Sequence, residues 1–251
     1  MEERKLTFFV SDVHLGADVN DTAAREERFV RFLRSIPAAR TEALYLLGDI
    51  WDFWYEYHDV VPKGSERVLA AITDLIAAGV KVFFFQGNHD MWTFGYLESL
   101  GIRVLQQPCL VDIQGRTFCL GHGDGLGPGN RGYKLMRRVF RSRWAQTLFS
   151  ALHPRIAFAL ARGWSMSRHR RHTSPYVFKG TDEPLYKFAE RFSQEHHVDY
   201  FIFGHFHTPV DMTLPGGAHL VVLDCWLKES CRPVVYFDGS LVGVGNVPVT
   251  A

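Results

Sequence analysis

The sequence predicts an α/β layered fold built on mixed β-sheets, and three features of the 251 residues point to it. In the first half, short apolar runs alternate with longer amphipathic segments, which is typical of strands and helices that take turns. After residue 199, strand-like runs follow one another, which argues against a purely parallel sheet. The hydrophobic fraction of 47% suffices for a large core, so we predict one domain over 1–251.

The predicted strands and helices follow one another along the chain. In the first half we expect the strands LTFFVSD, ALYLLGD, KVFFFQG and RTFCLGH, and helices at about 22–35, 65–78 and 93–100. A helix near 182–196 precedes DYFIFGH and four more strands, VDMTL, HLVVLD, PVVYFD and LVGVGN. The segment 131–170 is helical by pattern. Because the Gly- and Pro-rich run 123–132 is a candidate hinge, we predict an inserted helical subdomain over 125–175.

Charge is distributed unevenly along the chain. Lys and Arg total 28 against 27 Asp and Glu, which argues against a protein devoted to coating nucleic acid. The segment 131–171 nevertheless holds eleven Lys and Arg and no Asp or Glu. Its apolar residues at spacings of three and four predict one helical stripe: Tyr133, Met136, Phe140, Trp144 and Leu148. The alternatives for this segment are a small helical core with a solvated basic face, or a surface that binds an anionic substrate or lipid.

The start of the chain and the cysteines indicate a reducing compartment. The apolar run before Ser11 is too short for a secretory signal, and no run approaches the length of a membrane span. We therefore expect a cytoplasmic protein that at most touches a membrane. The four cysteines lack the pairing of a zinc site, so reduced thiols are expected at Cys109, Cys119, Cys225 and Cys231.

Polar side chains directly follow five of the predicted strands. They are Asp12 and His14; Asp49; Asn88, His89 and Asp90; His122 and Asp124; and His205 and His207. Taken singly, each such residue is more often part of a turn or a structural hydrogen bond than a ligand. Taken together, carboxylate, imidazole and amide donors without Cys favour Mn²⁺, Fe²⁺ or Zn²⁺ at a catalytic centre. Their number favours two ions that share a carboxylate.

Five short motifs give the chain a family resemblance. DVH, GDIWD, GNHD, GHGD and GHFH, in this order from about Lys5 to Val247, resemble the five sequence blocks of the calcineurin-like metallophosphoesterases. The resemblance implies a sandwich of two mixed β-sheets flanked by helices. It also implies that one metal is held by Asp12, His14, Asp49 and His207, and a second by Asp49, Asn88, His122 and His205, with Asp49 bridging.

The chemistry expected of such a centre is hydrolysis of a phosphoester or pyrophosphate. Two ions about 3.5–4 Å apart can activate water and stabilise the charge on phosphate oxygens. His89 would be catalytic, either by protonating the leaving oxygen or by stabilising the phosphoryl charge. Asp52 would orient His89, or else be a surface or helix-terminal carboxylate. Asp90 is a further polar group of the site or a helix cap.

Within the family, GDIWDFWYEY and GHGDGLGPG resemble the enzymes that hydrolyse UDP-2,3-diacylglucosamine in lipid A biosynthesis. The resemblance implies Mn²⁺, the products UMP and 2,3-diacylglucosamine 1-phosphate, and peripheral attachment to the inner face of the inner membrane. It implies a helical lid that holds the acyl chains, in the interval that the basic segment occupies. The implied substrate contacts are Asn88, His89, Asn130, Ser167, Arg168 and Arg171.

Two departures keep other substrates open. The well-known lipid A enzymes carry Arg where this chain has His89, and Asp where it has Asn130. The alternatives are a metallophosphoesterase for dinucleoside polyphosphates, cyclic nucleotides or nucleic acid, and a binding module without catalysis. We favour lipid over nucleic acid because the basic residues adjoin an apolar helix pair and no extended basic groove is evident. The sequence does not indicate the oligomeric state.

Overall fold

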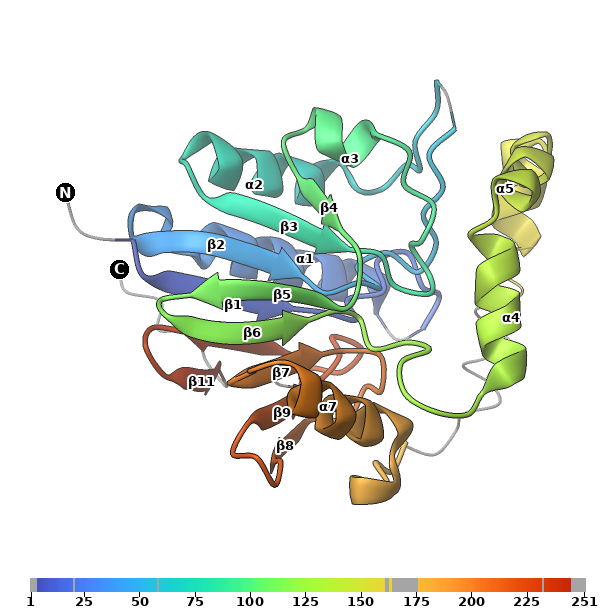
Figure 1. Cartoon of the computed structure of the whole chain (residues 1–251). Coiled ribbons are helices and arrows are strands. Elements are labelled where there is room, and N and C mark those ends of the chain that lie inside the picture. The colour runs from blue at the N-terminus through green and yellow to red at the C-terminus, as the bar shows by residue number, and fades with distance from the viewer. Residues whose placement is uncertain are drawn as a thin grey trace.

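Two β-sheets packed face to face form the body of the protein in the computed structural model, which describes residues 4–19, 21–57, 59–160, 163, 176–231 and 233–244 (Figure 1). The first sheet has the order β11-β10-β1-β2-β3-β4, with bounds Leu241–Val244, Val234–Phe237, Leu6–Val10, Thr41–Leu46, Lys81–Phe85 and Arg103–Leu105. The second has the order β5-β6-β7-β9-β8, with bounds Cys109–Ile113, Arg116–Leu120, Tyr200–Phe203, His219–Val222 and Val210–Thr213.

Both sheets are mixed, as the sequence predicted. Strands β1 to β4 are parallel and β10 joins β1 antiparallel, while β6, β7 and β9 are parallel with antiparallel strands at the two edges. Helices α1 (Thr22–Ser35) and α2 (Glu66–Ala77) cover the outer face of the first sheet, and α7 (Pro184–Glu195) covers the second (Figure 1). Asp21 begins α1 by accepting a hydrogen bond from the Ala24 amide, at 2.9 Å.

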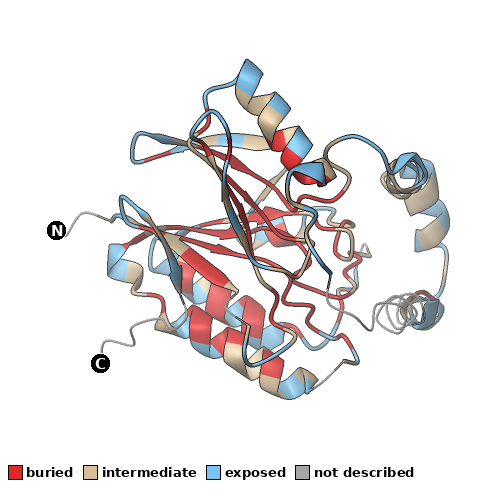
Figure 2. Ribbon diagram, turned by 90° about the horizontal axis from the view of Figure 1, so that it is seen from below, coloured by how far each residue is buried: buried red, intermediate tan, exposed pale blue. Residues whose placement is uncertain are grey.

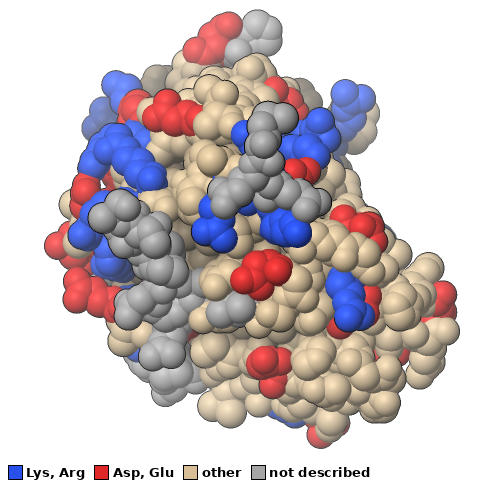
Figure 3. Space-filling model, turned by 90° about the vertical axis from the view of Figure 1, so that its left-hand side faces the viewer, with Lys and Arg blue, Asp and Glu red and all other residues tan. Residues whose placement is uncertain are grey.

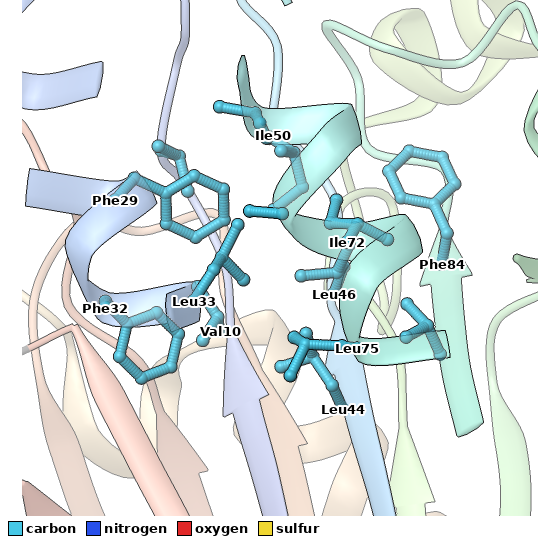
Figure 4. Packing of buried hydrophobic residues seen from close by; sticks show 14 of the residues in the cluster. Val10, Phe29, Phe32, Leu33, Leu44, Leu46, Ile50, Ile72, Leu75 and Phe84 are labelled. Atoms are coloured by element: carbon cyan, nitrogen blue, oxygen red, sulfur yellow. The ribbon is translucent and has the colours of Figure 1, made fainter. Parts of the chain in front are cut away.

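The core has three layers because apolar residues of the inner strands face both ways. Val10, Leu44 and Leu46 point to α1 and α2, where they meet Phe29 and Ile72 (Figure 4). Alternate residues face the second sheet and build the layer between the sheets, among them Phe9, Tyr45, Phe118 and Phe237. The third layer lies under α7. Figure 2 shows the buried residues gathered in the strands and on the inner sides of these helices.

Three elements differ from the sequence prediction. Helix α3 (Tyr96–Ser99) is shorter than the predicted 93–100, and strands β4 and β5 were not predicted. Both missed strands lie at sheet edges. Strand β4 has three residues and β5 is half exposed, so neither presents the long apolar run by which a strand is recognised.

The described part of the basic segment 131–171 folds as helices that stand beside the sandwich (Figure 1). They are α4 (Arg131–Phe140), α5 (Arg143–Ser150) and helical residues at 154–160. The single predicted stripe is wrong, because the helix breaks before Ser142, which caps α5, and because Trp144 and Leu148 are 84% and 73% exposed. The extent of a separate subdomain over 125–175 stays a prediction. Ser167, Arg168 and Arg171 lie outside the described residues.

The surface on the side opposite these helices carries charges of both signs. Figure 3 shows the end of the molecule opposite α4 and α5, where Lys and Arg lie among Asp and Glu. Within the ranges described, no helix is both long and apolar enough to cross a bilayer.

Candidate dinuclear metal centre

The predicted ligands lie at one edge of the sandwich. Strands β1, β2 and β3 run parallel, as do β6 and β7, so their carboxyl ends meet there. Five of these residues have left-handed backbone conformations, with φ between 52° and 74°: Asp12, His14, Asp49, His205 and His207. Such conformations are strained outside glycine and cluster at functional sites. The chain therefore turns sharply after β1, β2 and β7, and these turns bring the side chains together.

The first cluster combines the ends of β1 and β7. The Nε2 atoms of His14 and His207 lie 3.0 Å apart, and His207 Nε2 lies 3.1 Å from Asp12 Oδ1. Asp12 and His14 are buried. Two ring nitrogens and a carboxylate oxygen therefore face the same point, which suits a metal ion.

The second cluster combines the ends of β2, β3, β6 and β7. His122 Nε2 lies 3.3 Å from both Asp49 Oδ2 and Asn88 Oδ1, and His205 completes the group. Asp49 Oδ2 is also 3.9 Å from His14 Nε2. Asp49 thus lies between the clusters, as a shared ligand must.

Electrostatics and packing fit divalent cations at both clusters. Burial opposes the charging of His14 and His122. Even so, hydrogen bonds to Asp12 and Asp52 raise the pKa of His14 to about 10, and the charge of Asp49 raises that of His122 to about 10. Positive charge therefore stabilises the buried carboxylates, and protons on His14 and His122 provide it when no metal is bound. Metal ions would supply that charge by displacing these protons. A Cβ at Gly87 or Gly204 would collide with the carboxylates of Asp49 and Asp12, so only glycine leaves room there.

Hydrogen bonds behind the clusters fix the ring orientations. His122 Nδ1 lies 2.9 Å from the carbonyl of Leu47, which leaves Nε2 for a metal. Asp52 is buried, and its Oδ1 lies 3.3 Å from Nδ1 of both His14 and His89. His89 Nδ1 also lies 2.9 Å from the Asp52 carbonyl, and the His89 amide donates to Asp49 Oδ1 at 2.8 Å. The structure thus brings both predicted catalytic residues, His89 and Asp52, against the predicted metal ligands.

The family assignment follows from comparison with known proteins. A family model described as calcineurin-like phosphoesterase matches residues 6–209. The chain belongs to this family. Among solved structures, a dimetal phosphatase from Danio rerio resembles this phosphoesterase, with a TM-score of 0.51 and 16% identity, over 94% of this chain and 92% of that one. This likeness concerns the fold alone.

Curated relatives of this phosphoesterase align with nearly the whole chain. A Porphyromonas gingivalis protein named UDP-2,3-diacylglucosamine hydrolase is 36% identical over 253 residues, covering 94% of this chain and 95% of the relative. Proteins of the same name from Aeromonas hydrophila and Xanthomonas axonopodis pv. citri are each 32% identical. They match 90% and 93% of this chain and 95% and 96% of their own length.

Asp90 has a structural role that the sequence did not reveal. It is fully buried, and its two oxygens accept hydrogen bonds from the backbone amides of Asp49, Ile50, Trp51 and Gly87. The helix-cap interpretation is wrong, because α3 begins only at Tyr96. In this phosphoesterase Asp90 ties the turn after β2 to the turn after β3. One sequence signal could have indicated this role: Asp90 lies two residues after Asn88, beside a turn that contains glycine.

Asp124 connects α4 to the edge of the sandwich that carries the two ligand clusters, which we call the metal edge. Its buried carboxylate accepts from Gln107 Nε2 at 2.6 Å and from the Tyr133 hydroxyl at 2.9 Å, and lies 2.7 Å from Arg137 Nε. Asn130, predicted to contact substrate, is the residue before α4, with φ of 48° and an exposed side chain. The first turns of α4 are therefore anchored beside the second cluster.

An aromatic cluster fills the space between α5 and the turns after β2 and β3. Trp92 has ring centroids 4.7 Å from Phe149 and 5.9 Å from Phe140, and its Nε1 donates to the Phe140 carbonyl at 2.8 Å. Tyr55 lies 5.1 Å from Phe149, and its hydroxyl donates to the Gln146 carbonyl at 2.9 Å. The cluster, completed by Phe53, Phe94 and Phe158, forms an apolar wall next to the charged site.

Proposed function

We propose that this protein hydrolyses the pyrophosphate of UDP-2,3-diacylglucosamine to UMP and 2,3-diacylglucosamine 1-phosphate. The observation that carries the proposal is the aromatic cluster beside the two clusters of candidate metal ligands, joined by Asp124 to a basic helix. Such a site places side chains suited to a diphosphate beside apolar rings suited to acyl chains. The names of the curated relatives support the same substrate.

The proposed mechanism divides the work between the clusters and His89. Asp12, His14, Asp49 and His207 would hold one ion, and Asp49, Asn88, His122 and His205 the other. When bound, the ions, for which we propose Mn²⁺, neutralise phosphoryl charge and make water a better nucleophile. Water attacks the phosphorus on the uridine side, and the bridging oxygen leaves with the lipid. Because the Asp52 carbonyl lies 2.9 Å from Nδ1 of His89, Nε2 of His89 can hold a proton for that oxygen or stabilise the phosphoryl charge. Asn88, next to His89 in the chain, stays a proposed substrate contact.

The outer face of α4 and α5 suits attachment to the inner face of the inner membrane. Large apolar side chains are exposed there among basic residues: Leu135, Val139, Trp144 and Leu148. Arg138 and Arg143 are exposed beside them. Each basic residue near an anionic surface adds about 1 kcal/mol of attraction, and exposed apolar side chains on a helix can enter the lipid interface. Asn130, Ser167, Arg168 and Arg171 stay proposed substrate contacts.

The decisive experiment is a product assay with the Mn²⁺-loaded full chain. UDP-2,3-diacylglucosamine should yield UMP and the acylated sugar 1-phosphate, and Asp49→Ala should abolish both. Asp74→Ala, on the exposed face of α2, is the matched control and should retain the activity. The assignment fails if no UMP appears while a cyclic nucleotide, a dinucleoside polyphosphate or single-stranded DNA is cleaved well. Metal binding without turnover of any of these would indicate a binding module.

A further inference from the structure

Two cysteines lie close together in the segment that crosses between the sheets. Residues 223–231 leave β9 of the second sheet on the way to β10 of the first. Within this crossover, the Sγ atoms of Cys225 and Cys231 are 4.0 Å apart, and both are thiols. A disulfide needs about 2.05 Å between the sulfur atoms. The sulfur atoms must therefore approach by about 2 Å for a bond to form.

The two thiols differ in access. Cys225 is buried with 5% exposure, whereas Cys231 is partly exposed. The hydrogen bond from Cys225 also lowers the pKa of the Cys231 thiol, which increases its thiolate fraction. An external reagent thus meets Cys231 first, and Cys225 is placed to react with it afterwards.

The crossover is bonded to the metal edge. The Trp226 amide donates to the Asp12 carbonyl at 3.0 Å, and Arg28 Nη2 donates to the Trp226 carbonyl at 2.7 Å. The Trp226 ring packs on Phe29 with centroids 5.1 Å apart. Cys225 therefore precedes a residue that is fixed both to the core and to the turn that carries Asp12.

A soft metal ion is a weaker explanation of the pair. Asp224, Cys225 and Cys231 offer ligand atoms within 4.8 Å of one another. Structural zinc sites use four ligands, and among the described residues this group has three members. Two thiols with unequal access fit redox exchange better than a closed metal site.

We propose that Cys225 and Cys231 form a redox modification site, which a small disulfide of the glutathione class oxidises reversibly and whose closure weakens metal binding at Asp12. The Cys231 thiolate attacks the small disulfide, forms a mixed disulfide and releases one small thiol. The Cys225 thiol then attacks the Cys231 sulfur and releases the second small thiol. The protein loses two electrons and two protons, which the small disulfide gains.

The chemical step can be tested on the metal-free full chain with oxidised glutathione. The intact protein should lose the mass of two hydrogen atoms, with a 225–231 cross-link in its peptides, and dithiothreitol should reverse both. Cys225→Ser should instead stop at one glutathione on Cys231, while Cys231→Ser should stay unmodified at Cys225. Absence of the cross-link, or an equal mass loss in Cys231→Ser, would overturn the site.

The coupling can be tested by Mn²⁺ titration of the oxidised and reduced protein. Oxidation should weaken one of two binding events by about 10-fold, the lower end of the range for changes beside metal ligands. Oxidant-treated Cys231→Ser should bind like the reduced protein. Equal affinities in the cross-linked and reduced protein would overturn the coupling. Neither readout uses substrate, so failure here is distinguishable from failure of the proposed reaction.

Discussion

The metal edge and the helices α4 and α5 are built in opposite ways. At the edge, Asp12, His14, Asp49 and His122 are buried. The carboxylate of Asp90 accepts four backbone hydrogen bonds by itself. Neither α4 nor α5 contains a buried residue, and Figure 2 shows them exposed or intermediate throughout. Their attachments include the Asp124 network, the rings packed on Trp92, and the hydrogen bond from the Tyr55 hydroxyl to the Gln146 carbonyl.

This difference separates two tasks. Groups that stabilise developing charge work best when they are held in advance, and the edge meets that condition. A surface that admits a lipid must be able to open, and weakly packed segments open at low free-energy cost. We infer that the edge determines which bond breaks and the helices determine which molecule is held.

The largest effect is expected from Asp49→Ala. Loss of the shared ligand should remove both ions and lower kcat at least about 10³-fold, since removal of even one electrostatic donor costs about 10²–10³. Elemental analysis and the UMP assay check the two effects together. Two ions retained per chain in this variant would contradict the bridging position of Asp49.

Asp90→Ala should damage the edge through its backbone. The four amides that Asp90 satisfies would lose their acceptor, and each unsatisfied buried group costs about 1–3 kcal/mol. We expect the free energy of unfolding to fall by about 3 kcal/mol or more, measured by urea denaturation in EDTA. Asp90→Asn keeps one carbonyl oxygen and should lose less. A change below about 0.5 kcal/mol would show that these hydrogen bonds matter little.

Asp52→Asn should act on chemistry with little change in fold. It weakens the contacts that orient His14 and His89, and such changes cost about 10–100-fold in activity or metal affinity. Steady-state kinetics with saturating Mn²⁺ would measure the loss. If kcat were unchanged, Asp52 would be a structural carboxylate that does not orient His89 for catalysis.

Phe149→Ala tests the aromatic cluster. Its ring contacts Trp92 and Tyr55, and aromatic pairs contribute about 0.5–1.5 kcal/mol each. We expect kcat/KM for the diacylated substrate to fall about 10-fold, while hydrolysis of a small phosphodiester changes less than about twofold. Phe188→Ala on α7 is the matched control and should affect both substrates alike. Equal losses for both substrates in Phe149→Ala would contradict selection by the cluster.

The smallest effect on stability is expected from Trp144→Ser. Because this side chain is 84% exposed, the free energy of unfolding should change by less than about 0.5 kcal/mol. Binding to anionic vesicles should nevertheless weaken in a sedimentation assay. Unchanged vesicle binding would show that the outer face of the helices does not meet lipid.

The sequence predicted the metal edge better than the helices, and the reason is physical. A ligand at the end of an apolar strand is a local signal, and parallel strands bring such ends together. The role of Asp90 depends on the turn after another strand, and the Asp124 contact with Arg137 depends on where α4 docks. The stripe prediction failed because a periodic pattern does not show where a helix breaks, although Ser142 offered an N-cap signal.

One measurement tests the central claim most directly: kcat/KM of the Mn²⁺ enzyme for UDP-2,3-diacylglucosamine, compared with that for UDP-N-acetylglucosamine. The two substrates share the pyrophosphate and the uridine but differ in the long acyl chains. If the edge cleaves and the aromatic cluster selects, the diacylated substrate should be preferred by at least about 10²-fold, since each buried CH₂ contributes about 0.8 kcal/mol. Equal values, or faster cleavage of the unacylated sugar nucleotide, would contradict the account.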